Sequence, residues 1–219
     1  MKKFKLFLML PLLMVALVGV QSCSDDDDPP QPLTGEEVEI NVVSSWGTWN
    51  YFSFAEGKVI GTGAATAEAD AEWKVRTDWD IAFTRLYART NSGISGNGQG
   101  GVKEIPTDGS TSNGAAVFAN LIEAPTTGYV VDATDDLMIS MGGPAGPTYY
   151  NAGTCTTVNP WLTIAMPVVA TPKVFVIKTA DGKYAKIYLK AYQNANGDSG
   201  YITMEYVYQA SGSTNLLTE

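Results

Sequence analysis

The sequence predicts a single all-β domain built from antiparallel strands. Apolar residues alternate with polar ones far more often than they recur at helical spacing, Thr, Val, Tyr, Trp and Gly are abundant, and turn signals separate the alternating runs. Side chains of a strand point alternately to two faces, so this period of two indicates strands with one face on a core. A body of about 185 residues can bury one such core, and neither an internal repeat nor a second domain is visible.

The alternation sets the order of the expected strands. They cover residues 38–43, 49–54, 79–89, 129–131, 137–141, 161–166, 174–178, 183–192 and 201–208. Turn signals such as Asp108-Gly109, Asp181-Gly182 and Asn196-Gly197 lie between them. Short helices are expected only around 64–71 and 115–120. The polar tail after Ala210 is expected to fray.

The N-terminus predicts a signal peptide over residues 1–22. Lys2, Lys3 and Lys5 precede an apolar run over 6–20 that is too short to span a bilayer as a helix of ~20 residues. The next residues, Val20-Gln21-Ser22-Cys23, resemble the lipobox at which a signal peptide is removed and the cysteine sulfur is acylated. Lipidation of Cys23 is therefore predicted, with an ordinary thiol beside an ordinary cleavage site as the alternative.

Residues 23–36 are expected to form a solvated tether ahead of a domain over 37–219. Four consecutive aspartates, 25–28, repel one another, and Pro29, Pro30 and Pro32 have no amide hydrogen to donate. Acidic residues behind a lipidated cysteine also resemble the signal by which Bacteroides-type bacteria send lipoproteins to the outer face of the outer membrane. A plain spacer explains the same residues.

Charge and cysteine content exclude several classes of protein. Loss of the signal peptide removes three of fourteen basic residues and leaves eleven against twenty-three acidic ones, so a nucleic-acid partner is not expected. With Cys23 lipidated, Cys155 is the one remaining thiol and no intramolecular disulfide can form. A lone thiol is more often a small residue in a strand or loop than a metal ligand.

The chain contains no histidine, which excludes the usual Ser-His-Asp and Cys-His catalysis and His-ligated zinc. Two carboxylate pairs remain, but Asp78 and Asp80 flank a tryptophan and are expected on a solvated strand face, and Asp135 with Asp136 is expected in a turn. The loop 96–101 matches G-x-G-x-x-G, yet no helix follows it to meet a phosphate. An enzyme is therefore not predicted.

Methionine is the remaining candidate for chemistry. The mature chain keeps Met138, Met141, Met166 and Met204. Met204 alternates with apolar strand residues and is expected to fill the core. Met141 ends a strand and opens the Gly- and Pro-rich loop 142–147, and Met166 precedes Pro167, so both can reach into a cleft. Composition alone favours ordinary packing for all four.

Four blocks, in this order, resemble the HmuY-like haem-binding lipoproteins. Trp49-Asn50-Tyr51-Phe52-Ser53-Phe54 resembles the opening strand of that family. The most recognisable block is Asp78-Trp79-Asp80-Ile81-Ala82-Phe83, followed by Arg85, Arg89, Asn91, Gly93 and the glycine-rich loop. Trp161-Leu162-Thr163-Ile164-Ala165-Met166 resembles the strand that ends in a haem ligand, and residues 174–193 with 202–208 resemble the closing sheet.

The resemblance implies an all-β fold of the HmuY type in which two finger-like loops grip haem b as cargo, with two axial ligands and no catalytic turnover. It also implies a lipid-anchored protein of the outer membrane, facing the cell exterior. Such a protein takes haem from host haemoproteins and passes it to a TonB-dependent outer-membrane receptor for iron acquisition.

The resemblance also implies which residues would hold the iron. Members of the family use two histidines or, in some relatives, two methionines, and only methionine is available in this chain. Met166 stands where the second ligand stands. The first ligand of the histidine members lies on the loop corresponding to 142–150, where Met141 is the best substitute and Met138 the reserve. Tyr149 or Tyr150 is expected to cover the porphyrin.

Two other functions stay open at this point. A surface glycan-binding or adhesive lipoprotein could stack sugars on exposed aromatic residues such as Trp46 or Trp73. The same fold could also bind another tetrapyrrole, for example an iron-free porphyrin, which needs no axial ligand.

Overall fold

The computed structural model describes residues 35–163 and 167–217, which form antiparallel sheets with two short α-helices and one 3-10 turn. This confirms the predicted all-β class. The elements, in chain order, are β1 (Glu36–Asn41), β2 (Thr48–Ser53), β3 (Lys58–Ala64), α1 (Ala67–Lys74), β4 (Ile81–Phe83), β5 (Ala88–Thr90), β6 (Gly101–Ile105), α2 (Thr111–Asn120), β7 (Ala133–Ser140), β8 (Thr148–Thr154), the 3-10 turn η1 (Asn159–Trp161), β9 (Leu162–Thr163), β10 (Val169–Ala170), β11 (Lys173–Lys178), β12 (Tyr184–Gln193) and β13 (Ser199–Gln209).

The larger sheet has five strands in the order β1-β13-β12-β11-β6. β11 and β12 form the hairpin expected around Asp181-Gly182, with Lys178 opposite Tyr184 and Gly182 at a φ of 84° that favours glycine. One face of this sheet lies on the main core and the other lies under α2, where Phe118 packs with Val174 and Tyr188. Because both faces are covered, the central strand β11 contains a continuous apolar run, Val174 to Ile177.

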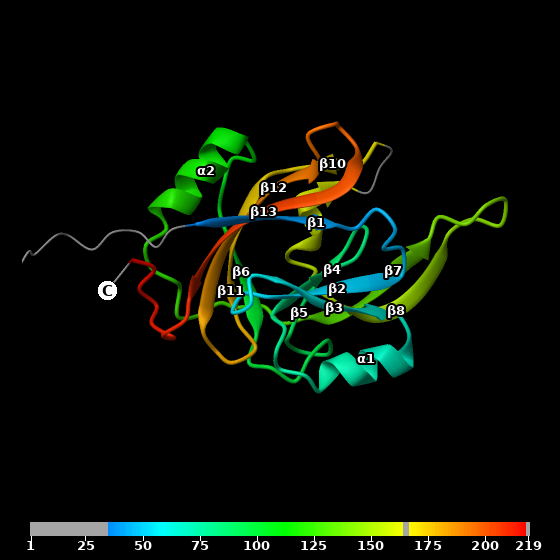
Figure 1. Cartoon of the computed structure of the whole chain (residues 1–219), viewed down its shortest axis with the longest axis horizontal. Helices are drawn as coiled ribbons and strands as arrows, with labels where there is room; N and C mark the ends of the chain where they lie inside the picture. Colours follow the sequence, from blue (N-terminus) through cyan, green and yellow to red (C-terminus); the bar gives the residue numbers. More distant parts are fainter. Residues whose placement is uncertain (1–34, 164–166, 218–219) are drawn as a thin grey trace, which may run out of the picture.

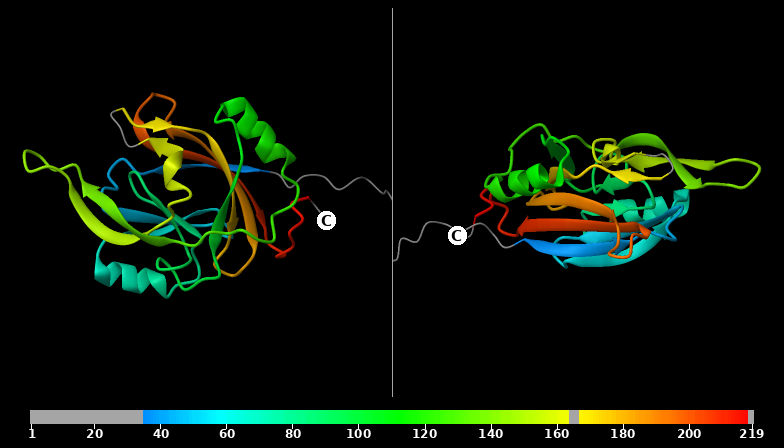
Figure 2. Two further views of the ribbon diagram at one scale, coloured as in Figure 1. Left: turned by 180° about the vertical axis from the view of Figure 1, so that it is seen from behind. Right: turned by 90° about the horizontal axis from the view of Figure 1, so that it is seen from above.

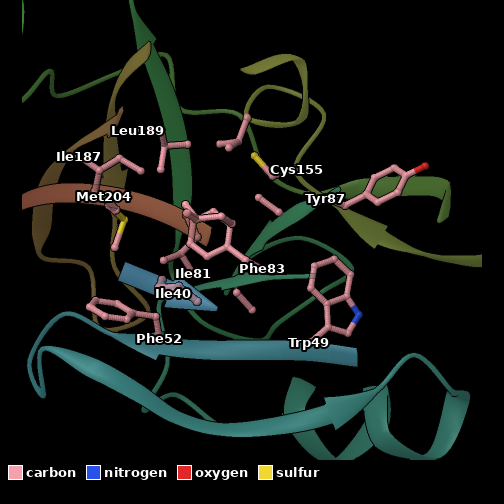
Figure 3. Packing of buried hydrophobic residues seen from close by; sticks show 14 of the residues in the cluster. Ile40, Trp49, Phe52, Ile81, Phe83, Tyr87, Cys155, Ile187, Leu189 and Met204 are labelled. Atoms are coloured by element: carbon pink, nitrogen blue, oxygen red, sulfur yellow. The ribbon is translucent and has the colours of Figure 1, made fainter. Parts of the chain in front are cut away.

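A four-stranded sheet, in the order β3-β2-β4-β5, packs against the first. The contact between the two sheets is the main hydrophobic core, and Figure 3 shows its centre. The side chains that meet there are at most 2 % exposed: Ile40, Ile187, Leu189 and Met204 from the larger sheet, and Trp49, Phe52, Ile81 and Phe83 from the smaller one. The expectation that Met204 fills the core is confirmed.

Several expected elements differ in the structure. Residues 79–89 are not one strand: β4 and β5 are separated by a tight turn, in which the amide of Thr84 donates to the carbonyl of Tyr87 at 2.9 Å. Residues 129–131 form no strand, only an isolated bridge between Val130 and Val102. Strands β3, β6, β8 and β10 were not expected.

The C-terminal tail packs against the body as far as the described residues extend, so the expectation of fraying is wrong. Leu216 is fully buried beside Ala124 and Val176, and its amide donates to the carbonyl of Ile122 at 2.9 Å. One leucine in a polar tail was a weak signal, and its burial compensates for the entropy of ordering the segment.

Strands β7 and β8 form a two-stranded hairpin that extends well beyond the two sheets, at the end of the molecule opposite α2 (Figure 1). Figure 2 shows the same projection from two further directions. The short β9–β10 pair lies beside β12, and Val169 and Ala170 of β10 line a hollow together with Thr111, the first residue of α2. Among the described residues, no helix combines the length and apolarity needed to cross a bilayer.

Candidate functional site

The two consecutive tyrosines, Tyr149 and Tyr150, lie on opposite faces of the projecting hairpin. Leu137 lies opposite Tyr150, and Met138 lies opposite Tyr149. Directly opposed residues of an antiparallel pair share a face. Leu137 is fully buried against the body, so Tyr150 faces the body, and Met138 and Tyr149 occupy the other face.

Burial and hydrogen bonding differ between the two faces. The hydroxyl of Tyr150 donates to a carboxylate oxygen of Asp70 in α1 at 3.2 Å, and its ring packs on the core. Tyr149 is 51 % exposed, while Met138 is half-buried at the margin of the core. Tyr149 is therefore free to contact a ligand, and Tyr150 holds the hairpin to the body.

A β-bulge near the tip changes how the methionines are oriented. The pairing runs from Met138 opposite Tyr149 directly to Ser140 opposite Thr148, so β7 carries one extra residue, Ile139. The extra residue shifts the alternation by one, and Met138 and Met141 no longer belong to opposite faces. Met141, just beyond β7, is 48 % exposed.

The turn after Met141 depends on glycine. Gly142 has a φ of 64°, and a Cβ atom on it would lie 1.6 Å from the carbonyl oxygen of Gly146. No other residue fits this position without reshaping the loop. The loop is residues 141–147, shorter than expected, because Thr148 to Tyr150 already belong to β8.

The second candidate ligand, Met166, lies outside the described residues, as do Ile164 and Ala165. The structure does show the pair of strands that flanks them: Leu162 and Thr163 of β9 lie opposite Ala170 and Val169 of β10. Trp161, immediately before β9, is buried and meets Tyr192 edge to face at 6.3 Å. Residues 164–168 therefore connect two anchored strand ends.

The first carboxylate pair, Asp78 and Asp80, differs in its surroundings from what was expected. Asp80 is buried rather than solvated, which corrects the expectation, and its oxygens accept the amides of Phe54 and Ala180 at 2.9 and 3.0 Å. Burial raises the pKa of Asp80, whereas the guanidinium of Arg76 lowers that of the exposed Asp78. Both line a hollow of about 520 Å³ in which Lys58 pairs with Glu56 and Arg76 pairs with Asp78.

The second carboxylate pair, Asp135 and Asp136, also lies elsewhere than expected. These two aspartates lie in β7 rather than in a turn, so they point to opposite faces of the hairpin. Among residues 35–163 and 167–217, no cluster of three or more Cys, Asp or Glu side chains could hold a metal ion.

Cys155 and the glycine-rich loop have structural roles. Cys155 is a free, buried thiol, and burial raises its pKa to about 12, so it stays protonated at neutral pH. The loop 96–101 packs closely on Asn91, whose side-chain oxygen accepts the amide of Gly98 at 3.0 Å. A Cβ on Gly98 would lie 2.8 Å from the backbone of Ala180, so the glycine permits close packing.

The aromatic residues proposed for sugar stacking are not free. Trp73 is 5 % exposed and stacks on Tyr51 with ring centres 3.6 Å apart, which corrects its assignment as a surface residue. The guanidinium of Arg76 lies over its ring at 3.9 Å. Trp46 is half-buried with Arg85 above it at 5.7 Å.

The structure adds residues that sequence reasoning did not assign. Arg89 of β5 is 1 % exposed, with its guanidinium 4.2 Å from the ring centre of Trp49 and 5.0 Å from that of Tyr51. Its Nη1 donates to Asp70 at 2.7 Å, the same carboxylate that accepts Tyr150. Burial lowers the pKa of Arg89 to about 9, which leaves it charged at neutral pH. A cationic residue in an otherwise apolar predicted strand is the sequence feature that could have indicated a buried structural role for Arg89.

Comparison with solved structures agrees with this architecture. A protein of Bacteroides vulgatus described as HmuY-like and haem-binding is 26 % identical, with a TM-score of 0.60 over 81 % of this chain and 97 % of the other. A lipoprotein of Bacteroides fragilis is 25 % identical, with a TM-score of 0.60 over 80 % and 89 %. The apo HmuY analogue of Tannerella forsythia, 19 % identical, shares the fold with a TM-score of 0.58 over 82 % and 97 %. A search of curated protein sequences gave no match.

The fold thus places this chain in a class of antiparallel β proteins already represented by those structures. The family model for the HmuY protein matches residues 45–206, from the loop before β2 into β13. This chain belongs to the HmuY family.

Proposed function

We propose that this protein binds haem between the β7–β8 hairpin and the segment that joins β9 to β10, and that it does so without catalytic turnover. One observation carries the proposal: the hairpin presents an exposed thioether, Met141, and an exposed ring, Tyr149, on a projection outside the packed core. Binding residues are often carried on segments that project from a rigid scaffold. Family membership and the haem-binding description of the Bacteroides vulgatus relative support haem as the ligand.

The proposed axial ligands are Met141 and Met166, with Met138 in reserve for the first position. Met141 is favoured over Met138 because its side chain is half-exposed, whereas Met138 packs against the core and would have to leave it. Tyr149 would cover the porphyrin, and Tyr150 would not, since its hydroxyl is engaged by Asp70.

The cellular role proposed is that of a haem carrier. With Cys23 lipidated in the outer membrane and the body facing outward, the protein would take haem b from host haemoproteins. It would then deliver this cargo to a TonB-dependent receptor for iron acquisition. The description of the Bacteroides fragilis relative as a lipoprotein supports the lipidation of Cys23. Nothing in the described residues favours a glycan-binding function, because Trp73 is buried and Trp46 lies under Arg85.

Absorption spectra of the haem complex, in both redox states, test the ligands. A thioether is a soft neutral donor that raises the potential of haem iron, so ferrous haem should bind more tightly than ferric haem. A methionine pair also has no proton to lose near neutral pH, so its haem affinity should depend on pH less than the haem affinity of a histidine pair does. Met141→Ala and Met166→Ala should each weaken ferrous binding by about tenfold or more, which is 1.4 kcal/mol.

The control is Met204→Leu, which changes a buried methionine in the core and should leave the spectrum unaltered. A Met138→Ala variant that loses the spectrum while Met141→Ala keeps it would move the first ligand to the reserve residue. Retention of ligand by the Met141→Ala/Met166→Ala double variant would favour a tetrapyrrole without iron. Equal affinity for the two redox states would contradict two sulfur ligands.

A further inference from the structure

The root of the β7–β8 hairpin is held by one short segment of the body, residues 87–90, which comprises β5 and the residue before it. Thr90 donates its amide and hydroxyl to Asp132, immediately before β7, at 2.9 and 2.7 Å. Ala88 accepts the amide of Cys155, immediately after β8, at 2.8 Å. Both ends of the hairpin are therefore attached to the same short strand.

The other two residues of the segment contact the middle of the hairpin. The hydroxyl of Tyr87 accepts the backbone amide of Met138 at 3.3 Å and donates to the carbonyl of Asp136 at 3.5 Å, the limit of hydrogen-bond range. Arg89 reaches Tyr150 of β8 through Asp70. Four consecutive body residues thus hold both strands and both ends of the hairpin.

The Tyr87 hydroxyl fits the edge of β7 in the way a neighbouring strand would. On one edge of a strand, the carbonyl of one residue and the amide two residues later point to the same side. Asp136 and Met138 have this spacing, and a phenol can accept from the amide while it donates to the carbonyl. Burial raises the pKa of Tyr87, which keeps the proton that this double role requires. Figure 3 shows Tyr87 at the margin of the core with its hydroxyl directed away from the other labelled side chains.

We propose that Tyr87 is a positioning residue: its hydroxyl fixes the backbone of β7 at Met138, and so sets where the methionines and Tyr149 stand relative to the haem. This inference rests on the proposed function. A two-stranded hairpin has little stability of its own, and towards the tip this one leaves the core, where Met141 and Tyr149 are about half exposed. The direction in which its tip points must therefore be set by the contacts at its base.

The test is Tyr87→Phe, which removes the hydroxyl and keeps the buried ring. Its matched control is Tyr188→Phe. Tyr188 is also buried, and its hydroxyl donates to the carbonyl of Thr111, the first residue of α2, at 2.8 Å. Two readouts are compared: hydrogen exchange of the amides of residues 133–141 in the haem-free protein, and the affinity and spectrum of the ferrous haem complex.

In Tyr87→Phe we expect faster exchange over 133–141, about tenfold weaker haem binding and an altered spectrum, because a group that orients a ligand is lost. In Tyr188→Phe we expect none of these changes. Tyr150→Phe, which releases β8 from Asp70, should give the same exchange result as Tyr87→Phe. Identical exchange and haem binding in the Tyr87 and Tyr188 variants would overturn the inference. If the parent protein binds no haem, the proposed function fails, and the exchange comparison alone decides whether Tyr87 holds the hairpin.

Discussion

The two-sheet body and the β7–β8 hairpin are both antiparallel, but different forces hold them. In the body, side chains from two sheets interdigitate, and Phe52, Ile187 and Met204 are fully buried. The hairpin has two buried apolar anchors, Leu137 and Ala152, and is otherwise tied down by hydrogen bonds with Tyr87, Thr90 and Asp70. Hydrophobic burial contributes most to stability, so the body supplies the rigidity and the hairpin supplies an adaptable binding surface.

The largest effect is expected from a cavity in the body. Phe52→Ala removes a fully buried ring that meets Phe54 and Tyr206 edge to face at 5.5 and 5.6 Å. Deletion of such a ring should lower the free energy of unfolding by about 3–5 kcal/mol, as measured by urea denaturation. A loss below about 1 kcal/mol would mean that the sheets are not held together by this core.

A pH-dependent effect is expected at the root of the hairpin. Burial raises the pKa of Asp132 to about 6, above its value in the unfolded chain. Between pH 4 and 6 the folded protein therefore binds more protons at this group than the unfolded chain does. Its contribution to the free energy of unfolding is greatest in acid and falls by up to about 3 kcal/mol as the pH rises through 6.

Asp132→Asn tests this, because the amide oxygen can still accept one of the two hydrogen bonds from Thr90, and the side chain cannot titrate. The difference in unfolding free energy between parent and variant should change between pH 4 and pH 7, with the parent gaining stability relative to the variant in acid. A difference that stays constant across this range would show that Asp132 has the same pKa in both states.

The smallest effect on stability is expected at the exposed face of the hairpin. Tyr149→Ala should change the free energy of unfolding by no more than about 0.5 kcal/mol, because half of the ring is already in water. Haem affinity should fall nonetheless, since the ring is proposed to cover the porphyrin. A large loss of stability with unchanged haem binding would reverse the roles proposed for Tyr149 and Tyr150.

Strands with a clear apolar pattern could be predicted from the sequence. A strand whose residues are chosen to fit a packed neighbouring side chain could not. β11, β12 and β13 follow their apolar pattern closely. β3 was missed because it contains Gly61 and Gly63, which lower strand propensity. The structure explains them: a Cβ on either glycine would lie within 2.8 Å of the Trp73 ring, which α1 places over the strand.

The candidate site was predictable in its residue types more than in its geometry. The absence of histidine and the position of Met141 beside a Gly- and Pro-rich loop were visible in the sequence, and the structure leaves Met141 exposed. The bulge at Ile139 and the opposite orientations of Tyr149 and Tyr150 depend on how β7 pairs with β8. No local pattern marked that register, because β8 had not been recognised as a strand.

By itself, the sequence determined the all-β class, the order of the long strands and the chemistry available, because side-chain alternation and residue type are local properties. Only the tertiary structure decided which distant groups meet. Tyr87 reaches the amide of Met138 51 residues later, and Asp70 accepts hydrogen bonds from Arg89, 19 residues later, and from Tyr150, 80 residues later. Such contacts form because the packed sheets bring the groups together, and local spacing carries no record of them.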